Sequence, residues 1–485
     1  MKSHDLKDIR KRLEAGRFQE VIAQVASILH NNPPDAQAWL YLAQALENTR
    51  HRSLGWLAYE RAWILDPQAK WVDQVRPRFQ RTISNKQIPS WFRDLLKVPK
   101  VSLTAAMIAC NEERSIQQTL EAVAPAVDDI VVVDTGSDDH TATIAKRLGA
   151  SVYATSWNDD FSAARNFAMT HVKTDWVLWI DADEILDPED IKVPRLVAGL
   201  FHRYDPPLTL RVVLINDLGG SKEYNFDVSR LFPTRFGLRF WGRIHEQIGP
   251  PVGGIYKTAY HHPLVRIRLH HDGYDPSRLP QKLERNIRIL RLALNDNPDD
   301  VISWGFLGRE LYVQGNLEDA VNALYRAEKL AQDIDTYGRV PELRTYLVDA
   351  LIRLGRLDEA TAVSLRAIED SPNFPPALYG YGKAQLMMAL KLSESARRAL
   401  VATREKAPEY QGMITYDPQV PGWKSLVALA DVAKIQGDWT TAVSLYDEAR
   451  RQQAPAQAID IPLQHIREQI AQLQSILSAQ EPPNS

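Results

Sequence analysis

Three near-continuous apolar runs in the middle of the chain constrain its fold more than any other feature. They cover residues 103–110, 130–133 and 176–180, and stretches with helical spacing, such as 161–172, lie between them. Apolar runs of this length without alternation are typical of strands covered on both faces. Strand–helix alternation favours a mostly parallel α/β sheet. From about residue 207 to 270, polar residues interrupt the strands, which indicates antiparallel additions to the sheet.

The two ends of the chain carry a different pattern. Residues 38–67 have large and small apolar residues at the spacing of a tetratricopeptide (TPR) repeat, whose period is about 34 residues. The pattern returns in 304–327, 347–372 and 429–449, with a weaker trace around 396–408. Glycine-containing pairs at 315, 355 and 437 predict the turns between helices. Because one repeat cannot bury its own face, we expect stacked helical hairpins; generic hairpins are the alternative.

These patterns divide the 485 residues into four parts. We expect TPR-like helices in 1–95, an α/β domain in 100–275, TPR-like repeats in 276–455, and a helix with a disordered tail in 456–485.

Composition excludes several classes of protein. A net charge of −3 gives no electrostatic case for a nucleic-acid partner. The longest apolar runs are too short to span a bilayer, so we expect no transmembrane segment. The single cysteine, Cys110, fits a reducing compartment, and we expect a cytoplasmic protein in which Cys110 packs as a small residue at a strand end.

Acidic and amide side chains gather where the predicted strands end. A further strand is predicted at 151–157, which makes the run at 176–180 the fourth. Asn111 and Glu112 follow the first strand, Asp134 ends the second, and Asp181 and Asp183 follow the fourth. Ligands of parallel sheets lie beyond the carboxyl ends of the strands. Helix capping is the better explanation of any one of these clusters alone, but their occurrence together on one rim of the sheet favours a ligand.

The two aspartates after the fourth strand predict a cation. If the chain stays extended between Asp181 and Asp183, their carboxylates point the same way and repel each other. Oxygen ligands suit Mg²⁺ or Mn²⁺, and such ions commonly bind together with substrate phosphates. Neither the glycine-rich dinucleotide fingerprint nor the P-loop motif occurs, which argues against those classes.

Three segments together resemble glycosyltransferase family 2, whose catalytic domain has the Rossmann-like GT-A fold. They are AMIACNEERSIQQTLEAV, DDIVVVDTGSDDHTATIAKRLGA and WVLWIDADEIL. The flanking repeats resemble a subgroup that includes bacterial peptide S-glycosyltransferases. The resemblance implies metal-dependent, inverting transfer of a sugar from a nucleoside-diphosphate sugar, most commonly a UDP-sugar, to an acceptor.

The resemblance also implies roles for individual residues around the donor. Asn111 and Glu112 match the loop against the nucleotide, and Asp134 matches the acid that contacts the base or ribose. Arg165 and Asn166 match a helix-borne pair near the nucleotide sugar.

The remaining roles concern the metal and the acceptor. Asp181 and Asp183 match the D-x-D motif that meets ribose and metal, with Asp183 as the direct ligand. GRIHEQI and HHDGY resemble two later motifs of the subgroup, in which Glu246 is the candidate catalytic base and His271 completes the metal site. The Glu-Asp pair and the Q-x-x-R-W element of many members are not evident.

Two of these assignments leave a structural alternative open. Glu246 has the alternative of an ion pair with Arg239 or Arg243. His271 has the alternative of a hydrogen-bonded structural histidine.

The repeats predict a partner, because TPR arrays build surfaces that hold peptides or helices. We expect them to present a protein or peptide acceptor, and self-association into a homo-oligomer is the competing role. Polysaccharide or lipid-linked acceptors remain an alternative. So does a catalytically inactive scaffold that binds nucleotide and partners. A nucleotidyltransferase would require a basic, glycine-rich N-terminal loop, which the sequence lacks.

Overall fold

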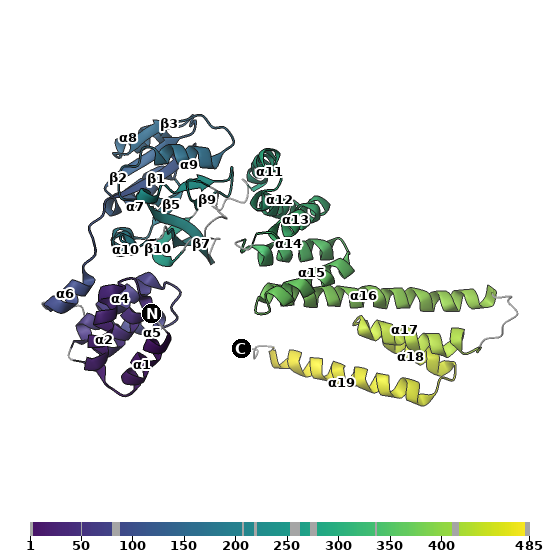
Figure 1. The fold of residues 1–485 in the computed structure, drawn as a ribbon. Coiled ribbons are helices and arrows are strands. Elements are labelled where there is room, and N and C mark those ends of the chain that lie inside the picture. Colours follow the sequence, from purple (N-terminus) through teal and green to yellow (C-terminus); the bar gives the residue numbers. More distant parts are fainter. Residues whose placement is uncertain are drawn as a thin grey trace, which may run out of the picture. The chain divides into compact units, whose positions relative to one another are not determined.

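The computed structural model describes residues 3–49, 51–79, 88–205, 208–217, 221–252, 262–271, 279–334, 337–409 and 417–480 (Figure 1). The chain forms two compact units. The first comprises residues 1–310 and 329–337, and the second comprises residues 311–328 and 338–485. The predicted division into four parts stays a prediction, because these units follow different boundaries.

The first unit contains an eight-stranded sheet with the strand order β3-β2-β1-β4-β7-β6-β10-β5 and a separate β8–β9 pair. The strands are β1 (Leu103–Ala109), β2 (Asp129–Asp134), β3 (Ser151–Ala154), β4 (Trp176–Trp179), β5 (Glu184–Leu186), β6 (Leu210–Asp217), β7 (Lys222–Pro233), β8 (Arg239–Trp241), β9 (Gln247–Gly249) and β10 (Leu264–His271).

The strand directions confirm the predicted mostly parallel sheet. Strands β1 to β4 pair in parallel, and β7 joins them antiparallel against β4 and β6. One detail differs from the prediction, because β10 runs parallel to β6 and antiparallel only to β5. The chain leaves the main sheet to form the separate β8–β9 pair before it forms β10. When it returns to the sheet, β10 runs in the same direction as β6.

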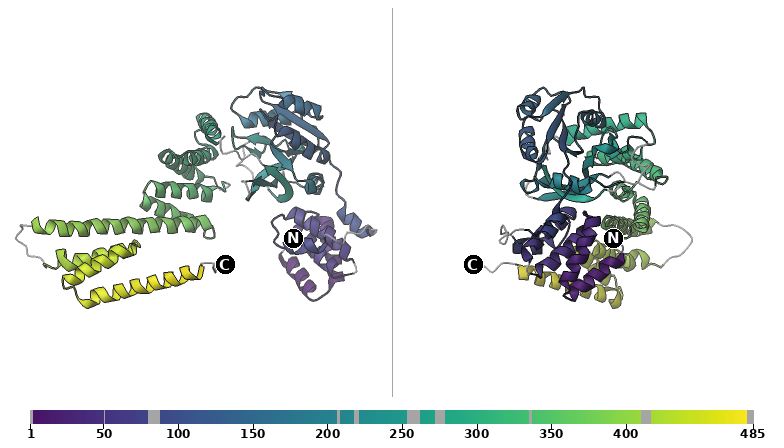
Figure 2. Two further views of the ribbon diagram at one scale, coloured as in Figure 1. Left: turned by 180° about the vertical axis from the view of Figure 1, so that it is seen from behind. Right: turned by 60° about the vertical axis from the view of Figure 1, so that its left-hand side comes forward.

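Apolar cores cover both faces of the parallel strands, and Figure 2 shows the backbone of the sheet and its helices from two further directions. On β4, Trp176 and Leu178 join the core on one face, while Val177 and Trp179 join the core on the other. This two-sided burial is the reason that these strands lack polar alternation. One face is covered by α7 (Ile116–Val123), α8 (Thr141–Arg147) and α10 (Val193–Phe201), and the other by α9 (Phe161–Met169).

The N-terminal helices have a core of their own and also contact the sheet. They are α1 (Ser3–Glu14), α2 (Phe18–Asn31), α3 (Ala36–Glu47), α4 (Arg52–Leu65), α5 (Val72–Phe79) and α6 (Ser90–Leu96). Trp39 and Tyr59, two of the predicted repeat positions, are buried in this core. Ile64 of α4 joins the core of the sheet.

The remaining helices follow β10 in the chain. They are α11 (Leu279–Asp296), α12 (Val301–Gln314), α13 (Leu317–Ala331), α14 (Val340–Arg353), α15 (Leu357–Asp370), α16 (Pro375–Lys406), α17 (Ser425–Ile435), α18 (Trp439–Arg451) and α19 (Ala456–Gln480).

Most of the predicted hairpins are present in these helices. The turns at Gly315, Gly355 and Gly437 have φ values of +90°, +74° and +77°, which glycine adopts without strain. The weak repeat predicted around 396–408 is wrong, because residues 396–406 lie within the single long helix α16 and only a short 3-10 turn at Ala407–Glu409 follows. Its sequence has no glycine turn pair to end the first helix of a hairpin. The C-terminal helix is confirmed as α19, and the tail after residue 480 lies outside the described residues.

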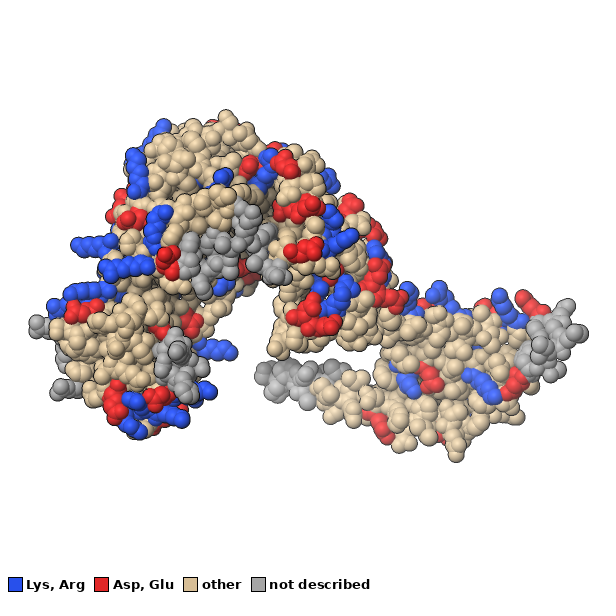
Figure 3. Space-filling model, viewed as in Figure 1, with Lys and Arg blue, Asp and Glu red and all other residues tan. Residues whose placement is uncertain are grey.

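Surface charge is mixed on the face shown in Figure 3, where acidic and basic side chains lie interspersed. This distribution agrees with the small net charge of −3.

Candidate active site

A cavity of about 590 Å³ lies at the carboxyl ends of the parallel strands, where ligands of α/β sheets bind. It is lined by Ile108, Ala109, Cys110, Glu112, Thr135, Trp157, Phe161, Arg165, Asp181, Ala182, Asp183, Glu184, Leu214, Asn216, Arg230, His271, Lys282 and Arg285. The structure therefore brings five of the candidate site residues, Glu112, Arg165, Asp181, Asp183 and His271, to one cavity. Their individual roles stay predictions.

The cation that faces the acids after β4 is an arginine of the chain itself. Arg230 of β7 contacts Asp181 Oδ2 and Glu184 Oε1 through Nη2, each at 2.5 Å. Its side chain is only 9% exposed and that of Glu184 only 3%. Sequence reasoning missed Arg230 because it lies about fifty residues away in a strand with no motif. An arginine within the buried end of a strand is the one signal that could have identified it.

The chain does not stay extended between the two aspartates, so the geometric premise of the sequence analysis is wrong. Residues 182 and 183 form a turn. Thr119 Oγ1 donates to the carbonyl of Ala182 at 2.9 Å, and the Asp181 N–H donates to Glu184 Oε2 at 2.9 Å. The turn directs Asp181 toward Arg230 and leaves Asp183 for a different partner.

Asp181 and Glu184 differ in their protonation behaviour. Burial opposes ionisation of Asp181, but Arg230 and Arg165 outweigh it and lower the pKa of that carboxyl. Burial, opposed by the charge of Arg230 and assisted by that of Asp181, raises the pKa of Glu184 to about 7. One guanidinium thus faces one firmly ionised carboxylate and one that titrates near neutrality.

Asp183 and His271 form the second pair in the cavity. His271 Nε2 lies 3.1 Å from Asp183 Oδ2, and His271 Nδ1 lies 3.3 Å from Asn216 Oδ1. The hydrogen bond to Asp183 raises the pKa of His271. Neighbouring ligands of an octahedral Mg²⁺ with bonds of about 2.1 Å lie about 3 Å apart, so this pair fits two adjacent positions around such an ion.

The predicted three-residue metal site is not formed. Among the described residues, no group of three or more His, Cys, Asp or Glu side chains could hold a metal ion. Asp181 is engaged by Arg230 and Arg165, which separates it from the Asp183–His271 pair. Asp272, Gly273 and Tyr274, the remainder of the HHDGY motif, lie outside the described residues.

The loops after β1 and β2 form a hydrogen-bonded unit beside the cavity. Asn111 has a left-handed φ of 57°. Its Oδ1 accepts a hydrogen bond from the Asp138 N–H at 3.0 Å, and its own N–H donates to Ser137 Oγ at 3.0 Å. Asp134 Oδ1 accepts the N–H groups of Gly136 and Ser137, each at 2.9 Å. The other oxygen, Asp134 Oδ2, is buried and has no hydrogen-bond partner among the described residues.

Helix α9 contributes Arg165, which links the cavity to the segment around Glu246. Arg165 lies over the rings of Trp179 and Phe240, with its Cζ 4.8 and 5.3 Å from their centroids. It pairs with Asp181 through Nη2 at 3.2 Å and with Glu246 through Nε. Glu246 is therefore ion-paired, but with Arg165 rather than with Arg239 or Arg243.

Asn166, the neighbour of Arg165, has its side-chain amide engaged elsewhere. Its Nδ2 donates to the carbonyl of Phe240 at 2.9 Å, and its Oδ1 accepts the Phe240 N–H at 2.9 Å. These bonds hold α9 against β8, and Asn166 does not line the cavity. A direct contact with a sugar would require this pair of bonds to break.

Two acidic residues after β3 have structural partners. The side chain of Asp160 accepts the Ala163 N–H at 2.8 Å and caps α9. Asp159 pairs with Arg288 of α11.

Two features of the cavity depart from the sequence analysis. Lys282 and Arg285 of α11 line it, although the predicted α/β domain ends at residue 275. Cys110 is exposed and lines the cavity, so its interpretation as a packed residue is wrong. Strand β1 ends at Ala109, and Cys110 consequently lies in the loop beyond the sheet.

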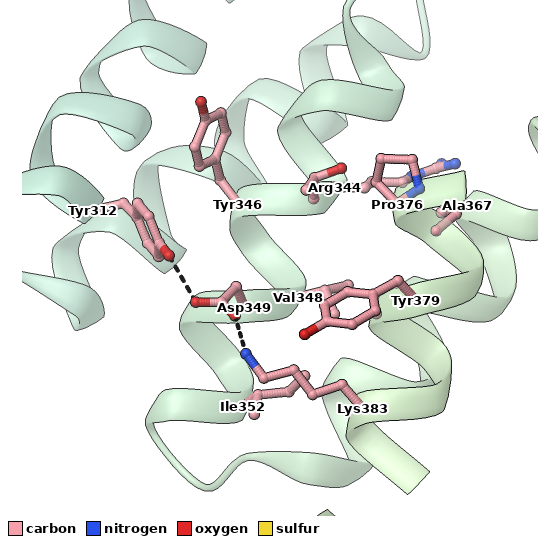
Figure 4. A pocket seen from close by; sticks show the side chains of 13 residues that line it. Tyr312, Arg344, Tyr346, Val348, Asp349, Ile352, Ala367, Pro376, Tyr379 and Lys383 are labelled. Atoms are coloured by element: carbon pink, nitrogen blue, oxygen red, sulfur yellow. Dashed lines mark hydrogen bonds and ion pairs between the residues drawn. The ribbon is translucent and has the colours of Figure 1, made fainter. Parts of the chain in front are cut away.

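A second pocket lies in the second unit, between helices α12, α14 and α16 (Figure 4). Its volume is about 200 Å³, and tyrosines 312, 346 and 379 line it together with aliphatic residues. Asp349 accepts hydrogen bonds from Tyr312 Oη at 2.7 Å and from Lys383 Nζ at 2.6 Å. Tyr379 is 71% exposed, so part of its ring is free to contact a partner.

No helix in the part of the chain that the structure describes is long and apolar enough to cross a membrane.

Family models match two regions of the chain. The model for glycosyl transferase family 2 matches residues 104–218, and a tetratricopeptide repeat model matches residues 307–377.

Curated proteins resemble larger parts of the chain. A TPR repeat-containing protein of Synechococcus elongatus is 32% identical over 228 residues, which are 45% of this chain and 54% of that protein. The SPbeta prophage-derived glycosyltransferase SunS of Bacillus subtilis is 25% identical over 280 residues, which are 57% of this chain and 63% of SunS. The chain thus spans less than two thirds of either relative.

Solved structures align more distantly. Residues 1–349 of S. aureus TarS in complex with UDP-GlcNAc align with a TM-score of 0.33 and 14% identity, covering 56% of this chain and 93% of that chain. Glucosyl-3-phosphoglycerate synthase of Mycobacterium tuberculosis in complex with Mn²⁺, UDP and glucosyl-3-phosphoglycerate aligns with a TM-score of 0.20 and 21% identity, covering 24% of this chain and 45% of that chain.

The family models identify the two kinds of domain that the chain contains. The chain contains a glycosyltransferase family 2 domain joined to a tetratricopeptide repeat region.

Proposed function

We propose that the protein transfers a sugar from a nucleoside-diphosphate sugar to a protein or peptide acceptor in a reaction that requires a divalent metal. The observation that carries the proposal is the Asp183–His271 pair, 3.1 Å apart within the large cavity at the carboxyl edge of the sheet. Uridine is the proposed base of the donor, and Mn²⁺ or Mg²⁺ the proposed ion.

Asp183 and His271 would hold the metal, with oxygens of the diphosphate completing its coordination. A bound Mg²⁺ or Mn²⁺ would supply Lewis acidity toward the charge that develops on the leaving diphosphate. Asp181 has a different proposed part, since Arg230 and Arg165 already neutralise it. Its remaining lone pairs are available for a ribose hydroxyl.

The leaving diphosphate would also meet cations of the chain. Arg165, Lys282 and Arg285 all line the cavity. Arg285 lies over the ring of Phe161, with its Cζ 5.3 Å from the centroid, which restricts the direction of its guanidinium. Charged donors of this kind strengthen binding to phosphate oxygens. The helix that follows the predicted α/β domain is therefore proposed as part of the donor site.

Asp134 is proposed to bind the base or the ribose. Its Oδ2 is buried without a partner among the described residues, and an unsatisfied buried carboxylate oxygen destabilises the protein until a donor reaches it. An N–H group of a base or a ribose hydroxyl would satisfy it. Glu112 lies on the cavity wall nearby, whereas Asn111 would act by shaping the loop.

Glu246 is proposed as the base that takes the acceptor proton. The acid is 8% exposed and pairs with Arg165, which itself lines the cavity. A base in this position contributes typically ~10²–10⁴-fold to a rate. Direct displacement needs no enzyme nucleophile.

The acceptor would be a polypeptide held by the C-terminal repeats. The support is the pocket between α12, α14 and α16, with its exposed Tyr379 and its fixed Asp349 and Lys383. Self-association and a cytoplasmic location stay predictions.

A nucleotide-binding scaffold without catalysis is the second candidate. The observation that favours it is that both Asp181 and Glu246 are already ion-paired with Arg165. A panel of nucleotide sugars, with detection of released nucleoside diphosphate in the presence of Mn²⁺, separates the two. Metal-dependent release that Asp183→Asn abolishes supports the transferase, whereas nucleotide binding without any release supports the scaffold.

A further inference from the structure

A third cavity, of about 450 Å³, lies behind the candidate active site. It is lined by Trp63 and Pro67 at the end of α4 and by residues of β6, β7 and β10. Strand alternation places it on the opposite face of the sheet from the active site, because Leu214 and His271 line the first cavity while Ile215 and His270 line this one.

The lining of this cavity carries more positive than negative charge. Lys222, Arg266 and Arg268 line it, and Asp187 is its one acid among the described residues. That acid is already engaged, since Asp187 lies 2.9 Å from His270 Nε2 and 3.3 Å from Arg268 Nη2.

Arg268 is already engaged by acidic residues of the chain through Nε and Nη2. It donates to the fully buried Asp190 through its backbone N–H, Nε and Nη2, and to Glu189 through Nη2.

Arg266 differs from Arg268 in how its guanidinium is hydrogen-bonded. It is 2% exposed, its Nε donates to Asp190 Oδ1 at 3.0 Å, and its guanidinium lies over Trp63, 4.0 Å from the ring centroid. Its Nη1 has no hydrogen-bond partner within the described part of the chain. Burial lowers the pKa of Arg266 against the opposing charges of Asp190 and of Glu60, whose Oε1 lies 3.8 Å from Nη2. A buried guanidinium N–H without an acceptor is unfavourable, and an anion would relieve it.

The other walls of the cavity are apolar. Val213 and Ile215 of β6 and Phe226 of β7 line it, and Tyr224 is 53% exposed and stacks on Phe226 with their centroids 6.3 Å apart. A ligand that fills this space must therefore present an apolar surface as well as a charge. The volume lies within the range of small-molecule sites, about 300–1,000 Å³.

We propose that this cavity binds a carboxylate or phosphate group carried on an apolar body, with Arg266 and Lys222 facing the anion and Tyr224 and Phe226 facing the body. The carboxylate could belong to a peptide and the phosphate to a small metabolite, and the test separates these sources. The inference does not depend on the proposed glycosyl transfer.

The test measures binding of three probes to the full chain by calorimetry, with excess UDP and Mn²⁺ present to compete at the other cavity. The probes are hippurate, phenyl phosphate and the neutral amide of hippurate. We expect at least one of the two anions to bind with a dissociation constant below about 10 mM, and the amide to bind at least about tenfold more weakly. Preference for hippurate indicates a carboxylate ligand, and preference for phenyl phosphate indicates a phosphate ligand.

Two charge reversals locate the site. Lys222→Glu, at an exposed position on the rim, should weaken anion binding by about tenfold or more. Lys282→Glu makes the same change of charge at the active-site cavity and should leave probe binding unchanged. Arg266→Met should also abolish binding, and Lys222→Glu keeps the test decisive if that buried variant fails to fold. Equal binding of the amide, no binding of either anion, or sensitivity to Lys282→Glu alone would each overturn the proposal.

Discussion

Arg230 and Glu184 form a nearly fully buried ion pair, with 2.5 Å between Nη2 and Oε1, directly behind the aspartate that begins the D-x-D motif. The same nitrogen contacts Asp181, so a single side chain of β7 compensates two acids of the active-site turn. The acids after β4 are therefore compatible with a folded protein before any metal or nucleotide binds. The proposed metal requirement therefore belongs to the reaction rather than to the fold.

The first prediction concerns this ion pair. Arg230→Met leaves the buried Glu184 without its cation and leaves Asp181, whose side chain is 34% exposed, with Arg165 alone. Breaking a buried pair in this way costs about 3–5 kcal/mol. The free energy of unfolding, measured by urea denaturation at pH 7.5, should fall by that amount.

A neighbouring arginine provides the matched control. Arg211→Met removes a cation that is 35% exposed and lies 3.5 Å from Asp227, and its effect should stay within about 1 kcal/mol. Adding Glu184→Gln to Arg230→Met should recover part of the loss. Equal stability of Arg230→Met and wild type would contradict the interpretation of Arg230 as the compensating charge.

The second prediction follows from the pKa of Glu184, which burial raises from 4.5 to about 7. A group that binds its proton more tightly in the folded state stabilises the fold fully below pH 4.5, and this contribution is lost as the pH rises through 7. The difference between these two pKa values corresponds to a free energy on the order of 3 kcal/mol. Wild type should therefore lose stability relative to Glu184→Gln between pH 4.5 and 7.5. Parallel pH profiles of unfolding free energy for the two proteins would show that Glu184 stays ionised throughout.

The sequence predicted more of the fold than of the candidate site. The buried strands and the repeats were predictable because their signals are local: apolar runs for β1, β2 and β4, and small residues at fixed spacing for the hairpins. Arg230 was not, because its position beside Asp181 depends on the antiparallel register of β7, in which Leu231 pairs with Leu178. The turn at residues 182–183 was equally hidden, since Thr119 of α7 holds it from outside the segment.

The third prediction concerns metal binding. Asp183→Asn should abolish Mn²⁺-dependent binding of UDP, measured by calorimetry, because it removes the charged member of the Asp183–His271 pair. The melting temperature should change little, since the Asp183 side chain is 33% exposed. The control is His140→Asn, which alters a histidine that is 79% exposed and paired only with Glu113 among the described residues. Retention of full Mn²⁺-dependent UDP affinity in Asp183→Asn would remove the proposed metal site.

The fourth prediction concerns Glu246. Glu246→Gln keeps the shape of the side chain but removes its basicity, so turnover at saturating donor should fall more than tenfold, within the ~10²–10⁴ range of base catalysis. The acidic limb of the pH–rate profile should disappear in the variant, which a purely structural role would not produce. A loss below tenfold with an unchanged pH profile would assign Glu246 to holding Arg165 instead.

The last prediction concerns the C-terminal repeats, and the structure determines where they can be cut. Lys282 and Arg285 line the donor cavity, and His245 stacks on Phe306 with 3.9 Å between the ring centroids, so truncation before α12 would damage the first unit itself. Residues 329–337 also belong to that unit. Truncation after Tyr337 is therefore the appropriate test. It should retain metal-dependent release of nucleoside diphosphate by donor hydrolysis and lose transfer to a polypeptide acceptor.

Point variants refine this test without removing helices. Tyr379→Ala combined with Lys383→Ala alters the pocket between α12, α14 and α16, and should raise the KM for a polypeptide acceptor about tenfold or more while leaving the KM for the donor unchanged, since the loss of a few interface contacts costs typically 1–2 kcal/mol. Leu365→Ala, at a residue of α15 that is 50% exposed and does not line the pocket, is the matched control. If the truncated chain glycosylates the acceptor as fast as the full chain, the repeats do not present it, and self-association becomes their better explanation.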